Sequence, residues 1–240
     1  MPEYLTELKQ KEDVAEGTMA FHFRKPDGFE FRAGQAIDLT LIDPSETDAE
    51  GNTRAFSIAS APSDPDLVVA TRMRDSVFKR VLKAAAPGLQ AKVDGPTGSL
   101  TLHKNANKPA VFLAGGIGIT PFRSIARDAA ADKLPHTIYL FYSNRRPEDA
   151  AFLDELQQLP TANPHFHLIA TMTEMEKSHS KWEGDTGFLT ADKLRQRLPS
   201  LQGPIYYIAG PPSMVSGLRQ MLVEAAVDED DIRTEDFAGY

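Results

Sequence analysis

A glycine-rich turn separates an apolar segment from a helical one near the middle of the chain. The apolar residues 109–114 have the continuous character of a buried strand, and a helix is predicted to begin at Pro121. Glycines let backbone amides approach a phosphate closely, and a helix N-terminus adds unpaired N–H donors and a favourable dipole. This turn is therefore predicted to bind a phosphate group. The residues expected to do so are Gly115, Gly116, Gly118 and Thr120.

A second turn of this kind follows the last apolar strand, residues 205–209, where Gly210 and Pro211 lead into a helix from Pro212. The carboxyl ends of parallel strands meet at one edge of a sheet, and open α/β sheets bind their ligands there. Two such turns at one edge favour a nucleotide site. Two alternatives stay open. The first turn lacks the third glycine of the usual dinucleotide fingerprint, so it could be a tight turn in some other doubly wound domain. The second could be a helix start chosen for packing.

The elements before these turns have the pattern of strands. Apolar and polar residues alternate over 19–24 and again over 37–41, with turn residues such as Gly28 and Gly34 between the runs. Short strands at this spacing predict an antiparallel barrel or sandwich. Residues 76–86 interrupt the strands with a helical pattern, for which Ser76 is a plausible N-cap.

The elements after residue 108 have a different rhythm. Apolar strands are predicted at 109–114, 137–142, 167–171 and 205–209, and they alternate with helical stretches. This order predicts a parallel sheet that is covered on both faces. The boundary is expected at residues 104–108, so that residues 1–104 and 105–240 form two domains.

Composition narrows the classes of protein. The net charge of -8 argues against general nucleic-acid binding, and no apolar run is long enough to cross a bilayer. No charged and apolar leader opens the chain, so we expect a cytoplasmic protein. The 240 residues include no cysteine, which excludes disulfides and a Cys-ligated iron–sulfur cluster held by this chain. His165 and His167 have no third ligand nearby and are read as structural, so no metal site is predicted.

Four motifs, in this order, resemble those of the ferredoxin–NAD(P) reductase-like flavoenzymes, and the likeness covers nearly the whole chain. They are Arg54-Ala55-Phe56-Ser57, Gly95-Pro96-Thr97-Gly98, residues 115–121 and Gly210-Pro211-Pro212. The resemblance implies an antiparallel β-barrel domain that binds flavin, followed by a Rossmann-like parallel-sheet domain that binds a nicotinamide nucleotide. It further implies bound FAD, with FMN as an alternative, and NAD(P)H as co-substrate.

The resemblance also assigns flavin contacts. Arg54 presents a planar fork of donors that suits phosphates, and Phe56 stands where the family usually has a tyrosine against the flavin ring. By resemblance, the Ser57 hydroxyl reaches the flavin nitrogen that receives hydride. The remaining flavin contacts, which include the start of the helix after Arg72, are expected at Ala55, Arg72, Ser76 and Val77.

The C-terminal tail is expected to reach the flavin as well. By resemblance, Phe237 and Tyr240 are candidates to cover the ring, and Glu235 is a candidate for proton delivery. Ser57 and Glu235 are therefore the expected catalytic residues. Ala209 departs from the family, which often has cysteine at this place beside the hydride-transfer site.

The nucleotide's ribose is expected beside Asn144 and Arg145, which follow the second parallel strand. Arginine there suits the extra phosphate of NADP, whereas the stretch through residue 156 resembles members that use NADH. We therefore expect NAD(P)H, with a slight preference for NADH.

The resemblance implies that hydride passes from NAD(P)H to the flavin and electrons pass to a separate carrier, or the reverse. The carrier would be a ferredoxin, a cytochrome or an oxygenase component. A basic stretch over residues 72–83 could steer an acidic carrier, or could be a solvated helix face that partly serves the flavin. Three alternatives remain: a diaphorase that reduces free flavin, quinone or ferric chelates, a non-catalytic regulatory flavoprotein that responds to nucleotides, and a nucleotide-binding protein without flavin.

Overall fold

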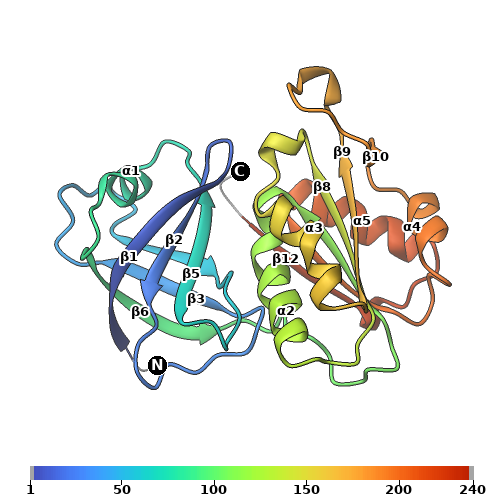
Figure 1. Cartoon of the computed structure of the whole chain (residues 1–240), viewed down its shortest axis with the longest axis horizontal. Coiled ribbons are helices and arrows are strands. Elements are labelled where there is room, and N and C mark those ends of the chain that lie inside the picture. The colour runs from blue at the N-terminus through green and yellow to red at the C-terminus, as the bar shows by residue number, and fades with distance from the viewer. Residues whose placement is uncertain (1–2, 238–240) are drawn as a thin grey trace.

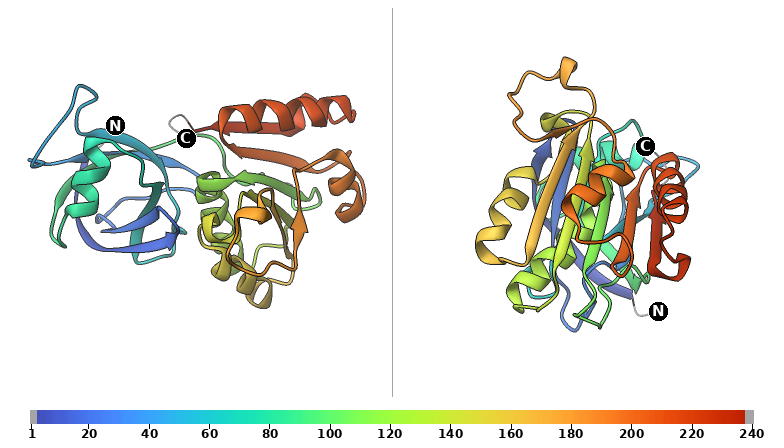
Figure 2. Two further views of the ribbon diagram at one scale, coloured as in Figure 1. Left: turned by 90° about the horizontal axis from the view of Figure 1, so that it is seen from above. Right: turned by 90° about the vertical axis from the view of Figure 1, so that its right-hand side faces the viewer.

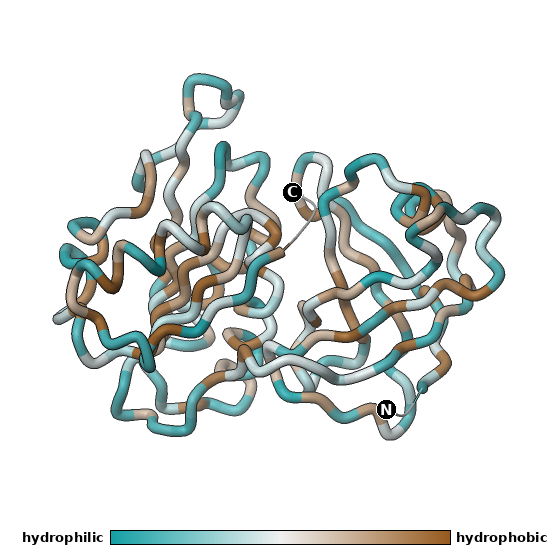
Figure 3. Tube along the Cα trace, turned by 180° about the vertical axis from the view of Figure 1, so that it is seen from behind, coloured by the Kyte–Doolittle hydropathy of each residue, from teal (hydrophilic) through white to brown (hydrophobic). Residues whose placement is uncertain are grey.

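A computed structural model of the chain describes residues 3–237 and consists of two six-stranded sheets. Figure 1 shows the two sheets side by side, with the N-terminal half in blue to green and the C-terminal half in green to red. Apolar residues follow the central strands of both halves, whereas the loop beyond β9 (Phe166–Met172) is hydrophilic (Figure 3). No helix within residues 3–237 combines the length and the apolar character that a membrane span needs.

The first sheet is antiparallel and has the strand order β4-β3-β6-β1-β2-β5. Its strands are β1 (Glu3–Ala15), β2 (Thr18–Arg24), β3 (Ala36–Leu41), β4 (Thr53–Ser57), β5 (Asp66–Arg72) and β6 (Gln90–Thr97). The sheet curls until its two end strands approach, where Ile58 bridges Val69. A core of Phe21, Leu39 and similar residues fills the inside of the curl. The expected antiparallel β domain is thus confirmed.

Helix α1 (Val77–Ala84) lies between β5 and β6, as the sequence predicts. The Ser76 hydroxyl accepts a hydrogen bond from the backbone N–H of Lys79 at 3.3 Å, which confirms Ser76 as the N-cap. Phe78 and Leu82 face the sheet because they recur at helical spacing. This packing fixes the start of α1 at the rim of the curled sheet.

The second sheet is entirely parallel, with the order β10-β9-β8-β7-β11-β12, as expected for an α/β fold. Its other strands are β7 (Ala110–Gly115), β8 (Ile138–Asn144), β10 (Asp185–Thr186), β11 (Ile205–Gly210) and β12 (Ile232–Asp236). The helices are α2 (Ile119–Ala131), α3 (Leu153–Ala162), α4 (Ala191–Arg197) and α5 (Pro212–Glu224), and η1 (Gly116–Gly118) is a 3-10 turn. Helices α2 and α3 cover one face, and α4 and α5 cover the other (Figure 2).

The sequence did not predict β12, because its residues Ile-Arg-Thr-Glu-Asp lack the apolar run of a central strand. The strand pairs with β11 at the end of the sheet, with Glu235 opposite Ala209. Its edge position explains this composition. An edge strand pairs with a neighbour along one edge only, so it is less buried than a central strand and needs fewer apolar residues. Its pairing brings the C-terminal residues to the carboxyl edge, beside the two glycine-rich turns.

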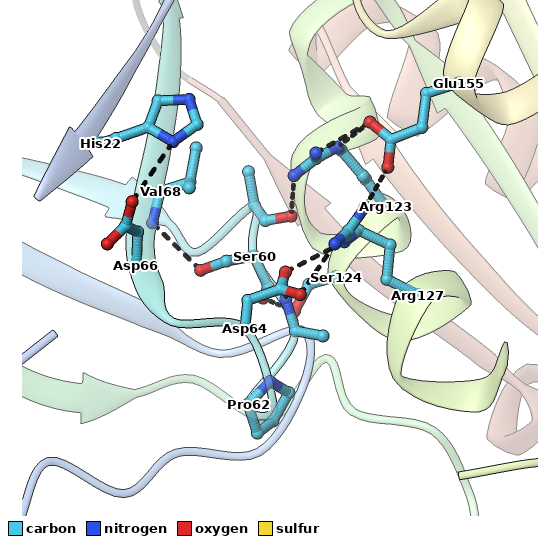
Figure 4. Close-up of polar contacts among 12 residues, drawn as sticks. His22, Ser60, Pro62, Asp64, Asp66, Val68, Arg123, Ser124, Arg127 and Glu155 are labelled. Atoms are coloured by element: carbon cyan, nitrogen blue, oxygen red, sulfur yellow. Dashed lines mark hydrogen bonds and ion pairs between the residues drawn. The ribbon is translucent and has the colours of Figure 1, made fainter. Parts of the chain in front are cut away.

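Polar contacts of α2 join the two sheets (Figure 4). Arg127 donates to both carboxylate oxygens of Asp64, at 2.7 and 2.9 Å, and also to Glu155 in α3. Arg123 donates to the carbonyl of Ala59 at 2.7 Å and to Glu155 at 2.9 Å. These bonds hold the middle of α2 against the curled sheet, and the first glycine-rich turn leads directly into this helix.

Candidate functional site

The two glycine-rich turns lie in contact at the carboxyl edge of the parallel sheet. A Cβ atom on Gly118 would stand 2.2 Å from the carbonyl oxygen of Ala209, and one on Gly210 would stand 3.2 Å from Gly115. Gly210 also has a φ of 158°, which L side chains rarely adopt. The Thr120 hydroxyl donates to the carbonyl of Ile117 at 3.1 Å, so that this side chain fastens its own turn. Only glycine at these positions allows the turns to pack so closely.

A cavity of about 750 Å³ opens at this edge. Five of the eight residues predicted to bind the nucleotide line it, and they come from three strand ends: Gly115, Gly116, Asn144, Arg145 and Pro211. Gly118 and Gly210 are not among the lining residues. Arg72 and Arg74 reach it from the other sheet. The Asn144 side chain is 5 % exposed, and its amide has no hydrogen-bond partner within the described part of the chain. A buried amide of this kind is suited to a polar ligand or a water molecule.

Phe188 lines the same cavity and was missed by the sequence reading. Its side chain is 77 % exposed, which is unusual for an aromatic residue in an ordered turn. The preceding Gly187 is fixed, because its N–H donates to Met172 and its carbonyl accepts from Thr171 and Lys193. The ring is thus presented to solvent by a well-anchored turn. Its exposure could not be inferred from residue type alone.

A second cavity, of about 520 Å³, lies between the two sheets. Seven of the residues predicted to contact flavin line it: Arg54, Ala55, Phe56, Ser57, Arg72, Ser76 and Phe237. Thr120, which was predicted to bind the nucleotide's phosphate, lines this cavity too. Val77 does not line it and packs against the core of the curled sheet instead. Phe56 lines the cavity and also packs in the core of the curled sheet, where the centre of its ring lies 5.9 Å from that of Phe78. Tyr240 lies outside the described residues.

Positive charge gathers in this second cavity. Arg54, Arg72, Arg74 and Lys79 all line it. Burial, reinforced by the charges of Arg74 and Arg54, lowers the pKa of Lys79. Burial is the larger cause, and the two neighbouring guanidinium groups add a smaller repulsion that a bound anion would relieve. The cavity is therefore suited to phosphate groups.

Arg54 is held at the mouth of this cavity by the loop before β4. Its guanidinium donates to the carbonyls of Glu50, Gly51 and Thr53 at 2.8–3.1 Å. It also donates to the Glu50 carboxylate at 2.8 Å and lies over the ring of Phe78. The planar group is thus fixed in orientation. The sequence alone could not show that this guanidinium also pairs with a carboxylate of the preceding loop.

Ser57 and Glu235 meet between the two sheets. The Ser57 hydroxyl donates to Oε1 of Glu235 over 3.0 Å, and Ser57 is only 5 % exposed. Burial raises the pKa of Glu235 and the charge of Asp236 adds to this, although the bond from Ser57 opposes it. Two residues further on, the N–H of Phe237 donates to the carbonyl of Gly210 at 3.0 Å. The tail is thereby tied to the second glycine-rich turn.

The basic stretch over residues 72–83 does not form one exposed patch. Three of its cations line the cavity between the sheets, and Arg80 pairs with Asp75 at 2.6 Å and with Glu46 at 3.5 Å. This arrangement favours the reading in which the stretch partly serves a phosphate ligand. No cluster of three or more metal-ligating side chains occurs within residues 3–237.

The sequence has relatives among curated proteins. Residues 112–220 match the family described as the oxidoreductase NAD-binding domain. The chain is 31% identical to the phenol hydroxylase P5 protein of Acinetobacter pittii, over 87% of this chain and 58% of that protein. It is 30% identical to ferredoxin–NADP reductase B of Sorangium cellulosum, over 83% of this chain and 82% of that protein. The chain thus spans only about half to three-fifths of the length of some relatives that it matches.

Solved structures share the fold. A ferredoxin NADP+ reductase from Neisseria gonorrhoeae, with bound FAD and NADP, superposes with a TM-score of 0.81 at 21% identity, over 98% of this chain and 99% of that one. The likeness places both sheets in one shared architecture. Together with the extended match to the Sorangium reductase, it shows that the chain belongs to the ferredoxin–NAD(P) reductase-like family of flavoprotein reductases.

Proposed function

We propose that this protein is an FAD-dependent oxidoreductase that takes hydride from NAD(P)H and passes electrons to a separate carrier. The observation that carries the proposal is the adjacency of the two cavities. Arg72 and Arg74 line both, and the turn at residues 115–120 contributes to each. A flavin in one and a nicotinamide nucleotide in the other would therefore lie side by side, as hydride transfer requires.

The residues of the cavity between the sheets fit a flavin nucleotide. Four cations and the start of α1 match its phosphates, while Ser57, Phe56 and Phe237 provide a polar and aromatic surface for its ring. When bound, FAD supplies the chemistry of accepting a hydride and releasing electrons singly. We therefore propose FAD as the cofactor. FMN is the alternative, because its single phosphate could bind the same cations.

Ser57 and Glu235 are the proposed catalytic residues. The hydroxyl bonded to a carboxylate is a short path for a proton between the buried site and the C-terminal edge of the sheet. Because burial raises the pKa of Glu235, this carboxyl holds its proton at a higher pH than a solvated glutamate does. It is thus poised to give up a proton and recover it.

The glycine-rich turns are proposed to hold the nucleotide's phosphates. Asn144 and Arg145 are proposed to lie at the ribose, because both line the cavity beyond Gly116. Phe188, at the exposed rim, is proposed to stack on the adenine, since a rigid ring at a cavity mouth offers a flat apolar surface to a base. The slight preference for NADH stays a prediction.

A protein carrier is proposed as the electron partner, in the role that some relatives' names indicate. One relative is named as a protein of phenol hydroxylase, and another as the reductase component of propane 2-monooxygenase. Others are named ferredoxin–NADP reductase and NADH-cytochrome b5 reductase. We further propose the division into a flavin domain, residues 1–104, and a nucleotide domain, residues 105–240. A cytoplasmic location is proposed from the use of NAD(P)H.

The visible spectrum of the purified protein tests these proposals first. NADH and NADPH are added separately without oxygen. Bleaching of a flavin spectrum by one of them supports hydride transfer and identifies the donor. Bound flavin that neither nucleotide reduces would favour the regulatory alternative, and a colourless protein that takes up neither FAD nor FMN would refute the proposal. A comparison of electron-transfer rates then separates two functions. Faster transfer to protein carriers indicates a reductase component, and faster transfer to free flavin, quinone or ferric chelates indicates a diaphorase.

A further inference from the structure

The outer edge of β9 is open along most of its length. β9 (Phe166–Met172) pairs with β8 over all seven residues, whereas β10 pairs only with Thr171 and Met172. Residues 166–170 therefore have no ladder partner on that edge among the described strands. Natural proteins usually protect such an edge with Pro, Lys or a bulge. The segment Phe-His-Leu-Ile-Ala contains neither residue, and its pairing with β8 shows no break in register.

A groove of about 880 Å³ runs beside this edge, away from both glycine-rich turns. Its floor is apolar and is formed by Phe152 and Leu153 at the start of α3 and by Leu168 and Ala170 on β9. Leu168 and Ala170 are separated by two positions, so they face the same side of the strand. A strand added to the edge of β9 would therefore place every second side chain in this groove.

Trp182 forms a wall of the groove and is held in place. Its indole N–H donates to the carbonyl of Asp185 at 2.9 Å. Gly184 makes room for the ring, because a Cβ atom there would lie 2.5 Å from it. A tryptophan that is half-buried and already fixed loses little freedom on binding, and such residues often dominate the energy of an interface. Neither the flavin nor the nucleotide cavity includes it.

Acidic side chains surround the groove. Five acidic residues line it against one lysine, Lys181. Of these acids, Glu155 is neutralised by Arg123 and Arg127, and Glu148 is held by hydroxyl and backbone N–H donors. The others at the rim are Glu12, which is bonded to His22, and the exposed Asp154 and Glu183. The groove is therefore complementary to cations.

We propose that the open edge of β9 and the acidic groove beside it form a docking site for an extended basic segment of a partner protein. Main-chain hydrogen bonds to residues 166–170 would give affinity, as in other cases of strand addition. Alternate apolar side chains would enter the groove against Trp182, and lysine or arginine would meet Asp154 and Glu183. A second copy of this chain is disfavoured, because it would bring the same acidic rim and a net charge of -8.

The test uses Trp182, which is the only tryptophan of the chain and so reports this groove alone. The flavin-loaded protein is titrated with a capped heptapeptide of alternating lysine and valine, and tryptophan fluorescence is recorded. We expect a saturable change that weakens with added salt, together with slower amide exchange over residues 166–170. Two control peptides test the basis of binding: glutamate in place of lysine, and proline in place of valine. Each is expected to bind at least about tenfold more weakly, because one loses the charge match and the other the main-chain donors.

The double variant Asp154→Asn/Glu183→Gln is expected to weaken binding of the basic peptide about three- to tenfold. The matched control Asp27→Asn/Glu30→Gln removes two exposed carboxylates from the loop between β2 and β3 and should bind like the unmodified protein. Reduction of the flavin by NAD(P)H should be the same in all three proteins, so a failure here is separate from a failure of the proposed function. Equal binding of all peptides, no fluorescence change, or an unaffected double variant would refute the proposal. Self-association through this face, lost in the double variant by sedimentation, would also refute it.

Discussion

The Ser57 hydroxyl donates a hydrogen bond to Oε1 of Glu235 over 3.0 Å, although the two residues are 178 positions apart and belong to different sheets. Ser57 ends β4 of the curled sheet, and Glu235 belongs to β12 at the end of the parallel sheet. The bond therefore exists only when the two sheets are assembled. It places the proposed proton path where the two halves of the molecule meet.

Replacing Glu235 with glutamine should lower kcat about a hundredfold, because the variant keeps the shape of the side chain but loses its proton. In the unmodified protein, activity should fall as the pH rises through the pKa of Glu235, which burial raises above its ordinary value. That limb of the profile should be absent from Glu235→Gln. Steady-state rates across pH measure both effects. Asp236→Asn should keep this limb but move it to lower pH, because the charge of Asp236 adds to the raised pKa of Glu235. An unchanged limb in Glu235→Gln would assign the ionisation elsewhere.

The same carboxyl should make stability depend on pH. A group whose pKa is higher in the folded than in the unfolded protein stabilises the fold fully while it is protonated in both states. That contribution is lost as the pH rises through the folded pKa of Glu235. As the pH rises through the folded pKa of Glu235, the unmodified protein should therefore lose stability relative to Glu235→Gln. Urea unfolding at several pH values measures it, and parallel curves for the two proteins would contradict the prediction.

Gly118→Ala should damage both glycine-rich turns together. The added methyl carbon would stand 2.2 Å from the Ala209 carbonyl, so one of the turns must shift. We expect a loss of about 1–3 kcal/mol in the free energy of unfolding, as is usual for overpacking. Weaker nucleotide binding should accompany it. Gly217→Ala, where no atom lies within 4 Å of the added carbon, should keep or increase stability. Equal unfolding curves for the two variants would show that the turns adapt without cost.

Phe188→Ala should raise the KM for the nicotinamide nucleotide about three- to tenfold and leave kcat nearly unchanged, because stacking on adenine contributes to binding only. Steady-state kinetics separates the two constants. Val223→Ala serves as the control, because it removes an exposed apolar side chain on α5 that does not line the cavity. A fall in kcat without a change in KM would place Phe188 elsewhere in the reaction.

The sequence predicted those parts of the site that depend on backbone geometry. Gly115, Gly116 and Pro211 line the expected cavity because a turn between strand and helix has few alternatives once its glycines and proline are known. Two parallel strand ends must also share one edge of the sheet. The fold class followed from the change in apolar rhythm after residue 108, and both sheets confirm it.

Other features depend on contacts between distant segments and leave no local pattern. Strand β12 was missed because an edge strand needs few apolar residues. Val77 was expected at the flavin but faces the core, since a helix start fixes its phase only when it packs. The anchoring of Phe188 requires Thr171 and Lys193, which come from separate elements. Periodicity along one segment carries no information of this kind.

The contacts of Arg127 with Asp64 and Glu155 give the last prediction, which concerns the joint between the sheets (Figure 4). Burial alone would raise the pKa of Asp64, but hydrogen bonds from Arg127 and the Ala61 N–H outweigh it and leave that pKa below its ordinary value. Asp64→Asn should therefore cost about 1–3 kcal/mol of unfolding free energy at neutral pH, because a charged hydrogen-bond pair is lost.

The sign of the pH dependence separates this effect from a general loss of packing. A carboxyl with a lowered folded pKa stabilises the protein above its ordinary pKa, and the contribution disappears as the pH falls through the folded value. The deficit of Asp64→Asn should thus shrink in acid, as the unmodified protein loses the same bonds. Denaturant unfolding at neutral and acidic pH measures this, with Asp132→Asn as a surface control. A deficit that stays constant in acid would mean that Asp64 supports the interface by its shape, because the charge would then contribute nothing to the joint that aligns the two cavities.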